Sequence, residues 1–509
     1  MISVKGETLG TLQSLPTQFP LATITLLTPA VLLLHGYHPL ADDGAVYVTG
    51  IKKLANPSLY QSDSVFATSP TRFSIFAHVL APLLHRGPLP VLLLVCQVAS
   101  IFLFLLGAWL VATRIFSGRS SWGAVLLAAC CFTLPVAGTS LSIMDPYVTA
   151  RSFSTPLSLF ALAAVLDENW AGSILWLALA ALLHPLMAAY TALTMLTLAL
   201  VRRKMWPPVA LLCGLGSLLS AIIFLATHHA DAGLAYNRAA LSRSYFFLSS
   251  WRWYEYPGLA IPLLLLGFAG FRSRLPWAAR ALAITATLLG SCALLTSLCF
   301  VHRTGSLLLA RLQVLRAFQF VYIAGVLLAG GMLGRLAQQH KRAIALLYLL
   351  LMAALFAGQR LTYPESNHVE WPGLKPRNLW QDAFLWIRDN TPRDAIFALD
   401  NDYIEGPGED AQGFRATAER SAVADWFKDG GIAGNFPQAA ALWWQGSIAT
   451  QQLNRATDEQ RLARLQPLGV TWIVLPAEAG TGFPCPFNNA RVRVCRLGGA
   501  LLHRSEGAK

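Results

Sequence analysis

Charged side chains are scarce in this sequence. Only 13% of its 509 residues are charged, 55% are hydrophobic, and the mean hydropathy is +0.50. Acidic residues are especially rare in the first 359 positions, which hold nine of them against 23 Lys and Arg. This composition excludes an ordinary soluble enzyme and predicts a polytopic membrane protein. The net charge of +13 belongs to the membrane part, where basic residues flank spans or meet phosphate, so nucleic acid is not an expected partner.

Several common functional signatures are also absent. No Walker-type phosphate loop occurs, which argues against an ATP-driven pump, and no G-x-S-x-G nucleophile elbow is found. Met1–Pro20 lacks a basic start followed directly by an apolar core, so no cleavable signal peptide is expected. Any reaction therefore needs an activated substrate as its source of energy.

Eight cysteines divide between two environments. Six of them lie in apolar runs and are expected to be buried thiols. Cys485 and Cys495 flank a probable hairpin in the polar tail, where they would form a disulfide if the tail faces an oxidising compartment.

Eleven apolar segments are predicted to span the membrane, because each approaches the length that a helix needs to cross a bilayer. The segment 170–201 is divided in two at His184-Pro185, since proline ends or kinks a helix. The predicted spans are 17–36, 89–112, 122–138, 154–166, 170–184, 186–201, 207–226, 257–271, 281–300, 317–334 and 343–358.

The loops differ on the two sides of these spans. Arg202-Arg203-Lys204 and His340-Lys341-Arg342 adjoin span ends on one side, as is typical of the cytoplasmic face. The other side carries the long loops 36–88, 138–153, 227–256 and 301–316, and Thr71–His85 within the first is expected to be an amphipathic helix at the interface. We expect a bacterial inner-membrane protein with a cytoplasmic N-terminus.

The composition changes near Arg360, where a proline-rich linker begins. Residues 360–509 are predicted to form a soluble α/β domain, which an odd number of spans places on the periplasmic side. Its helices are expected from Leu379, near Gln438–Gln445 and at Asp458–Leu465, and its strands at Ala395–Leu399, Val470–Leu475 and Arg491–Leu497.

Carboxylates in the outer loops are the first candidates for chemistry. Asp42 and Asp43 stand side by side just after the first span, where ionised carboxylates are costly and usually functional. They either activate an acceptor hydroxyl or are a solvated loop start or helix cap. Asp145, followed by Pro146, suggests a helix start. Asp145 is either a second acid of the site or a helix cap, and Arg151 is either a phosphate-binding residue or a side chain that snorkels to the membrane interface. Asp63, Asp231 and Glu255 share the same face and would add to a carboxylate-lined cavity.

Basic residues gather in the last outer loop, at His302, Arg303, Arg311 and Arg316. In a helix, Gln313, Arg316 and Gln319 would share one face and bind a lipid phosphate through the arginine fork; the alternative is interface anchoring without a ligand. His184 and the run His228-His229-Ala230-Asp231 are possible metal ligands without a specific spacing, and a divalent metal ion stays a possible cofactor.

The chain resembles the GT-C superfamily of polyprenyl-phosphate-dependent glycosyltransferases in its layout. It has multiple spans, an acidic pair in the first outer loop, a later arginine-rich loop and a soluble outer domain after the last span. Trp386–Pro392 and Phe414–Ser421 look like stretches of uncharacterised bacterial membrane proteins placed near that group. The resemblance implies a first-loop aspartate as catalytic base, here Asp42 or Asp43. Leu442–Gly446 has the paired tryptophans of the oligosaccharyltransferase signature but not the acidic residue and tyrosine after them, so transfer of a preassembled glycan to asparagine is not expected.

The leading hypothesis is an inverting glycosyltransferase that takes a sugar from a polyprenyl-phosphate donor to an envelope glycan, lipid or protein acceptor. Asp42 or Asp43 would activate the acceptor, and Arg303, Arg311 and Arg316 would stabilise the leaving phosphate. Asp145 would orient the acceptor or support a metal. The alternatives are a transporter or flippase of a lipid-linked saccharide and a non-catalytic membrane scaffold.

Overall fold

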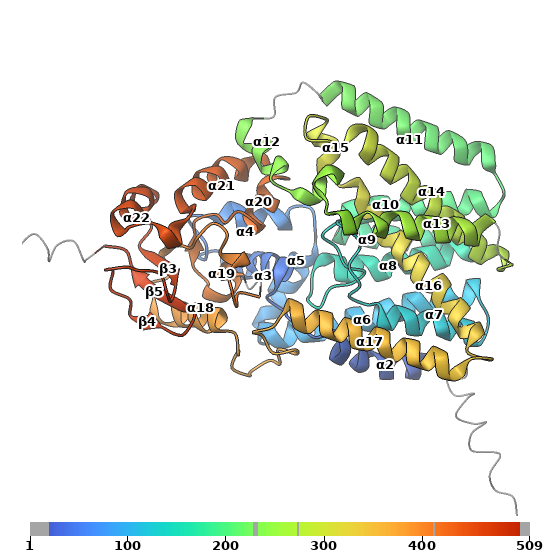
Figure 1. The fold of residues 1–509 in the computed structure, drawn as a ribbon, viewed down its shortest axis with the longest axis horizontal. Coiled ribbons are helices and arrows are strands. Elements are labelled where there is room, and N and C mark those ends of the chain that lie inside the picture. Colours follow the sequence, from blue (N-terminus) through green and yellow to red (C-terminus); the bar gives the residue numbers. More distant parts are fainter. Residues whose placement is uncertain (1–19, 228–232, 272–273, 411–412, 499–509) are drawn as a thin grey trace, which may run out of the picture.

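The structure is a computed structural model that describes residues 20–227, 233–271, 274–410 and 413–498. A bundle of near-parallel helices forms one half of the molecule, and a small sheet domain with its own helices forms the other (Figure 1). Short helices of the outer loops lie between the two halves. Residues 1–19, where no cleavable signal peptide is expected, and the run His228–Asp231 fall outside the described residues.

Within the described residues, the apolar segments predicted as spans lie largely within helices of the bundle, with one exception. The predicted span 122–138 is wrong in its second half, because the helix that begins at Arg119 ends at Cys130 and residues 131–138 are not helical. In the described part of the chain, seven helical segments are long and apolar enough to cross a membrane: Leu89–Ile115, Pro185–Arg202, Pro207–Ala226, Trp253–Phe271, Trp277–Phe300, Leu307–Leu336 and Lys341–Thr362. The other apolar helices are shorter, so a total of eleven spans stays a prediction. The bundle helices are α2 (Pro20–His35), α6 (Leu89–Ile115), α7 (Arg119–Cys130), α8 (Ala150–Leu166), α9 (Trp170–Leu183), α10 (Pro185–Arg202), α11 (Trp206–Thr227), α13 (Pro257–Phe271), α14 (Trp277–Phe300), α16 (Phe318–Leu336) and α17 (Lys341–Thr362).

Glycines allow the closest helix packing in the bundle, between α7 and α16. A Cβ atom placed on Gly123 would lie 2.4 Å from the Gly330 carbonyl oxygen and 2.7 Å from Gly334 Cα. Small residues at such a crossing let two helix backbones approach closely. In a membrane the lipid is as apolar as the helices, so the hydrophobic effect does not drive helices together and close van der Waals packing does. This contact fixes α16, and with it the basic segment that precedes α16.

The outer loops fold into short helices at one end of the bundle. They are α3 (Asp42–Ala55), α4 (Ser64–Thr68), η1 (Ser69–Thr71), α5 (Phe76–Leu80), η2 (Ala81–His85), α12 (Leu234–Leu241), η3 (Ser244–Phe246), η4 (Leu248–Ser250), η5 (Trp253–Glu255), α15 (Leu307–Arg311) and η6 (Val314–Ala317). The helix expected at Thr71–His85 is present only from Phe76, and α5 continues directly into the 3₁₀ segment η2, which has Pro82 near its start. Proline favours the beginning of a helical segment because it lacks an N–H.

The sheet domain has five strands in the order β2-β1-β3-β5-β4. β1 (Ile396–Ala398) pairs in parallel with β2 (Ser421–Ala422) and β3 (Trp472–Pro476), whereas β5 (Val492–Arg496) pairs antiparallel with β3 and β4 (Phe487–Asn488). Around the sheet lie α18 (Leu379–Asn390), η7 (Tyr403–Glu405), α19 (Phe414–Ala418), α20 (Lys428–Ala433), α21 (Pro437–Thr450), η8 (Leu453–Arg455), α22 (Asp458–Leu465) and η9 (Gln466–Leu468). The expected helices and strands are confirmed, apart from small shifts at their ends.

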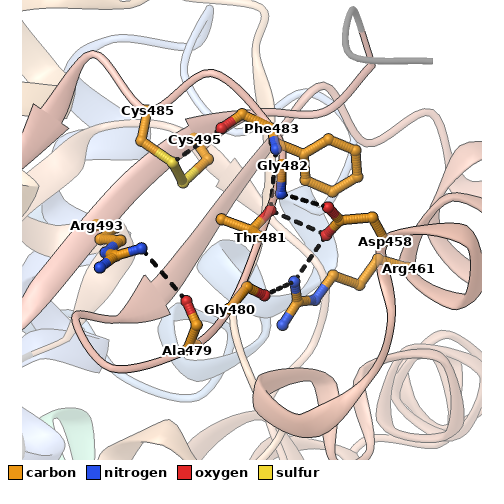
Figure 2. The surroundings of a disulfide bond; sticks show 10 residues. All are labelled: Asp458, Arg461, Ala479, Gly480, Thr481, Gly482, Phe483, Cys485, Arg493 and Cys495. Carbon is orange, nitrogen blue, oxygen red and sulfur yellow. Dashed lines mark hydrogen bonds and ion pairs between the residues drawn. A yellow bond between two sulfur atoms is a disulfide. The ribbon is translucent and has the colours of Figure 1, made fainter. Parts of the chain in front are cut away.

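A disulfide closes the end of this sheet. Cys485 and Cys495 are bonded, as the hairpin spacing indicated, and Cys495 is fully buried on β5. Next to the disulfide, Asp458 accepts hydrogen bonds from Thr481 Oγ1 at 2.9 Å and Gly482 N at 2.6 Å (Figure 2). The disulfide and this carboxylate hold the two ends of the loop before β4.

Candidate functional site

A cavity of about 660 Å³ lies where the outer helices meet the sheet domain. Segments far apart in the chain form its walls: the first turn of α3, the junction of α9 and α10, residues 242–245, the stretch around η6, and α20 with the residues after it. Six of the residues predicted from the sequence line it: Asp42, Asp43, His184, Arg311, Gln313 and Arg316. The acidic pair and the distant basic loop therefore share one cavity.

Asp42 and Asp43 begin α3 and enter the cavity from its first turn. Asp42 is held at both carboxylate oxygens: Tyr147 donates to Oδ2 at 3.0 Å, and Lys428 Nζ contacts Oδ1. Asp43 Oδ1 lies 3.4 Å from the same ammonium. Among the described residues, Lys428 is the hydrogen-bond partner of the Asp43 carboxylate. The side chains of Asp42 and Asp43 are 42% and 40% exposed, so both carboxylates face the open cavity.

Lys428 comes from the first residue of α20 in the sheet domain, nearly 390 positions after the aspartates it contacts. Its own N–H donates to Asp425 Oδ1 at 2.6 Å, which fixes the start of the helix. Burial lowers the pKa of Lys428 to about 8, because removing an ammonium from water disfavours its charged form.

Arg243 fastens this part of the sheet domain to the loop after α12. Its guanidinium donates to the Phe427 carbonyl at 2.5 Å and to the Trp426 carbonyl at 2.6 Å, and the residue is 5% exposed. A buried arginine from the membrane half therefore holds the part of the sheet domain that covers the cavity, residues 426–436, which we call the roof of the cavity.

Arg316 differs from the other arginines of the cavity in its freedom to bind a ligand. Its Nε is buried and has no hydrogen-bond partner among the described residues, and its guanidinium carbon lies 5.6 Å from the centre of the Tyr245 ring. A guanidinium offers a planar fork of donors that suits phosphate oxygens. Arg316 can thus accept a phosphate without first breaking an ion pair.

The predicted polar face through Gln313, Arg316 and Gln319 is wrong, because these residues do not share one α-helix. Gln313 has a left-handed backbone with φ of 52°, and Arg316 follows it in the 3₁₀ helix η6. Gln319 is fully buried in α16 and donates to the Ile143 carbonyl at 2.8 Å. The break at Gln313 leaves Gln313 and Arg316 beside the cavity and places Gln319 in the protein interior.

Arg311 lines the cavity but its donors are already engaged. Nε donates to the Gly434 carbonyl at 2.9 Å, Nη2 donates to the Tyr236 carbonyl at 3.1 Å, and the guanidinium stacks 3.6 Å from the centre of the Tyr236 ring. These contacts join α15 to α12 and to the sheet domain.

Asp145 and Arg151 form an ion pair at 2.5 Å beneath the cavity, and both are 5% exposed. They are absent from the lining of the cavity, whereas Tyr147 between them contacts Asp42. The predicted helix start at Asp145 is also wrong: α8 begins at Ala150, with Thr149 as its cap. The pair stabilises the loop that positions Tyr147.

The other candidate residues lie in varied places. His184 lines the cavity and caps α10, with its Nδ1 accepting from Met187 N at 3.4 Å. His302 and Arg303 lie outside the cavity lining, and Arg303 donates to the Leu241 carbonyl at 3.1 Å. Asp63 pairs with Arg415, and Glu255 accepts from Arg252 N at 2.5 Å, so the broader carboxylate cavity does not assemble from these two residues.

Sequence patterns did not identify Lys428, Arg243 or Tyr147 as parts of the site. Lys428 lies in the sequence Trp-Phe-Lys-Asp-Gly-Gly of the tail, which resembles an ordinary turn, and Arg243 lies in a loop just before the aromatic run Tyr245–Phe247. The surplus of basic over acidic residues in the membrane half was an available signal for Arg243, but it gave none for Lys428 or Tyr147.

The residues present do not form a recognisable metal centre. Within the described ranges, no group of three or more His, Cys, Asp or Glu side chains is placed to hold a metal ion. Asp42 and Asp43 are the two carboxylates of the cavity lining there, and both already contact Lys428.

One family matches part of the chain. Residues 378–445 match the family described as "Domain of unknown function (DUF6798)", and this segment contains α18, α19, α20 and the roof of the cavity. No curated protein matches the chain.

Solved structures of archaeal oligosaccharyltransferases are similar to this chain. The Archaeoglobus fulgidus oligosaccharyltransferase tethered to an acceptor peptide aligns with 12% identity and a TM-score of 0.46, over 91% of this chain and 70% of that one. AglB from the same organism, in complex with an inhibitory peptide and a dolichol-phosphate, aligns with 13% identity and a TM-score of 0.41 over the same shares. Likeness at this level of identity and TM-score assigns neither a substrate nor residue roles to this chain.

Proposed function

We propose that this protein is an inverting membrane glycosyltransferase that transfers a sugar from a polyprenyl-phosphate donor to a hydroxyl acceptor on an envelope glycan, lipid or protein. The supporting observation is the cavity in which the pair Asp42 and Asp43 lies among three arginines, one of which, Arg316, has a buried Nε without a hydrogen-bond partner among the described residues. A base and a phosphate-binding cation in one cavity are what displacement of a phosphate from a sugar requires.

Asp43 is the proposed base, and Asp42 is the proposed anchor beside it. Both oxygens of Asp42 are occupied by Tyr147 and Lys428, whereas Asp43 is contacted through one oxygen. Asp43 removes the proton from the acceptor hydroxyl as the acceptor oxygen forms a bond to the anomeric carbon of the sugar. The bond between that carbon and the phosphate oxygen breaks, and polyprenyl phosphate leaves with the electron pair.

Arg316 is the proposed binder of the leaving phosphate. Its unpartnered buried Nε becomes satisfied only when an acceptor group enters the cavity. Negative charge grows on the phosphate oxygen during the displacement, so a fixed guanidinium stabilises the transition state more than the ground state. Arg243 and Arg311 add positive potential while they hold the cavity walls together.

The proposed orientation has a cytoplasmic N-terminus and a periplasmic sheet domain in a bacterial inner membrane. The disulfide between Cys485 and Cys495 supports an oxidising surrounding for that domain. α10 begins at Pro185 in the cavity lining and ends at Arg202, and α17 begins at Lys341 and ends at Thr362 just before the sheet domain. The basic residues therefore stand at the helix ends away from the cavity and the sheet domain, as is typical of the cytoplasmic side.

The test begins with a strain that lacks the protein. Mass spectrometry of its lipid extract is expected to show accumulation of one polyprenyl-phosphate sugar, and complementation with the wild-type gene is expected to remove it. Asp43→Asn is expected to lower transfer by roughly 10² to 10⁴-fold, the range for loss of a general base. Arg316→Met is expected to lower it by roughly 10² to 10³-fold, as for loss of one transition-state donor.

Arg303→Met is the matched control, because Arg303 lies in the same loop region but outside the cavity. It is expected to retain transfer. Full complementation by the Asp43→Asn protein would refute Asp43 as the base. Movement of the lipid-linked sugar across the membrane without its consumption would show a transporter instead of a transferase.

A further inference from the structure

The sheet domain, whose segment 378–445 belongs to a family without an assigned function, covers the cavity and places a charged residue in it. Phe427, Lys428, Gly431, Asn435 and Phe436 all belong to this segment and line the cavity. Among these residues, Lys428 is the one that contacts the aspartate pair.

We infer that Lys428 is a positioning residue for the aspartate pair: the sheet domain supplies the ammonium whose charge bridges the two carboxylates and holds them at a fixed place in the cavity. The inference deepens the proposed function by giving the sheet domain a role in the same site. It rests on that function only for its effect on transfer, since the carboxylates can be probed without a substrate.

The first argument is geometric. One ammonium contacts Asp42 and lies 3.4 Å from Asp43, so it bridges two like charges that are neighbours in the chain. Two adjacent carboxylates disfavour each other's ionised form, and an opposite charge within about 4–6 Å restores it. Without Lys428 one of the two aspartates would take up a proton more readily.

The second argument is that Lys428 is held in place from both sides. Arg243 binds the two carbonyls that precede it, at Trp426 and Phe427. Asp429, the next residue, accepts two hydrogen bonds from Arg415 at 2.9 Å each. A lysine on a loose surface loop would lose much of its ion pairing to side-chain freedom, whereas this one starts from a fixed backbone.

The other charged groups around the ammonium do not replace it. The remaining cations of the cavity are Arg243, Arg311 and Arg316, none of which has an ion pair with either aspartate. Asp425 and Asp429 face it from its own segment and are bound to backbone N–H groups and to Arg415. The titratable neutral side chains on the surrounding elements are Tyr47, Tyr147, His184, Tyr245 and Tyr403.

The experiment measures the protonation of the aspartates directly. A fluorescent carbodiimide reacts with protonated carboxyl groups, and peptide mass spectrometry of the purified full-length chain quantifies labelling of Asp42 and Asp43 as a function of pH. In Lys428→Met, the pH of half-maximal labelling is expected to rise by about one unit or more, the shift that follows loss of an adjacent opposite charge. Lys428→Arg, which keeps the charge, is expected to stay within a few tenths of the wild type.

Lys375→Met is the matched control, because Lys375 is an 80% exposed lysine of the same half of the molecule that pairs with Asp382. It is expected to leave the labelling curve unchanged. Should Lys428→Met fail to fold, acetylation of Lys428 on the folded wild-type protein removes the same charge without a substitution. An unchanged labelling curve after either removal of the charge would overturn the inference.

Transfer provides the second readout and separates the two proposals. If the strain lacking the protein accumulates a lipid-linked sugar, its membranes serve as the donor source, and Lys428→Met is expected to reduce consumption of that species with rescue by Lys428→Arg. The rate of consumption is measured as a function of pH. If Lys428→Met lowers this rate equally at every pH, without shifting the fall in rate on the acidic side of the profile, Lys428 has only a structural role and the inference is contradicted. If no lipid-linked sugar accumulates while the labelling curve still shifts, the proposed function fails and the role of Lys428 stands.

Discussion

Replacing Arg415 by methionine is expected to destabilise the contact between the sheet domain and the first outer loop. Arg415 donates from Nη1 and Nη2 to the two oxygens of Asp429 at 2.9 Å, and its Nε contacts Asp63 from the loop after α3. The side chains of Arg415, Asp63 and Asp429 are 11%, 7% and 2% exposed. Methionine fills much of the same volume, so the change removes the charge with little loss of packing.

The size of the effect follows from the two carboxylates that remain. Breaking a buried ion pair by removing one partner costs about 3–5 kcal/mol, because an uncompensated charge is left behind. Here the guanidinium serves two carboxylates, but the Ala422 and Asp425 N–H groups each donate to one of them at 3.0 Å and relieve part of the penalty. We therefore expect about 3 kcal/mol, the lower end of that range.

The assay is urea unfolding of the full-length protein in detergent, followed by fluorescence of the buried tryptophans of the sheet domain. Arg388→Met is the control, since its ion pair with Asp389 is exposed and pairs of that kind contribute at most about 1 kcal/mol. The double variant Arg415→Met with Asp429→Asn is expected to recover part of the loss, because one of the orphaned charges is gone. A loss below about 1 kcal/mol for Arg415→Met, equal to the control, would show that the buried cluster does not hold the two parts together.

Three further outcomes are expected. Burial lowers the pKa of the Lys428 ammonium to about 8, so its ion pairs are present below that pH and lost above it. In a pH–rate profile, transfer is therefore expected to fall above pH 8 in the wild type, and the fall is expected at higher pH in Lys428→Arg. Removal of the Cys485–Cys495 disulfide, by reduction or by serine substitution, is expected to lower the free energy of unfolding of the sheet domain by about 2–3 kcal/mol in urea titration. Gly123→Leu is expected to prevent the close contact of α7 with α16, lowering the yield of folded protein on size-exclusion chromatography, whereas wild-type behaviour would contradict the packing at Gly330.

Much of the helical framework could be predicted from the sequence because hydrophobic run length is a local property. The division at His184-Pro185 and the limits of α22 were expected from proline chemistry and from the polar start at Asp458. The course of Thr71–His85 was not, because Pro82 and the contacts of the segment with neighbouring elements decide where its helix begins and where it becomes a 3₁₀ helix.

The candidate site was predicted in part. The approach of Asp42 and Asp43 to Arg316 was inferred from sidedness, since loops on the same face can meet. The free guanidinium of Arg316 was not foreseen, because it depends on the left-handed turn at Gln313, which ends one helical segment just before another begins. Lys428 was missed for a different reason. Its ion pair joins residues nearly 390 positions apart, and the sequence around each partner carries no pattern that depends on the other.

The backbone of Asp42 adds a practical consequence to its place at the start of α3. Its φ of 49° lies in the region that side chains with a Cβ atom rarely adopt, and Asn and Asp tolerate it better than most. An alanine substitution there combines loss of charge with conformational strain of about 1–2 kcal/mol, so an inactive alanine variant reveals little about chemistry. Asparagine at that position keeps the turn that aims residue 43, and it is the replacement whose phenotype reports on electrostatics alone.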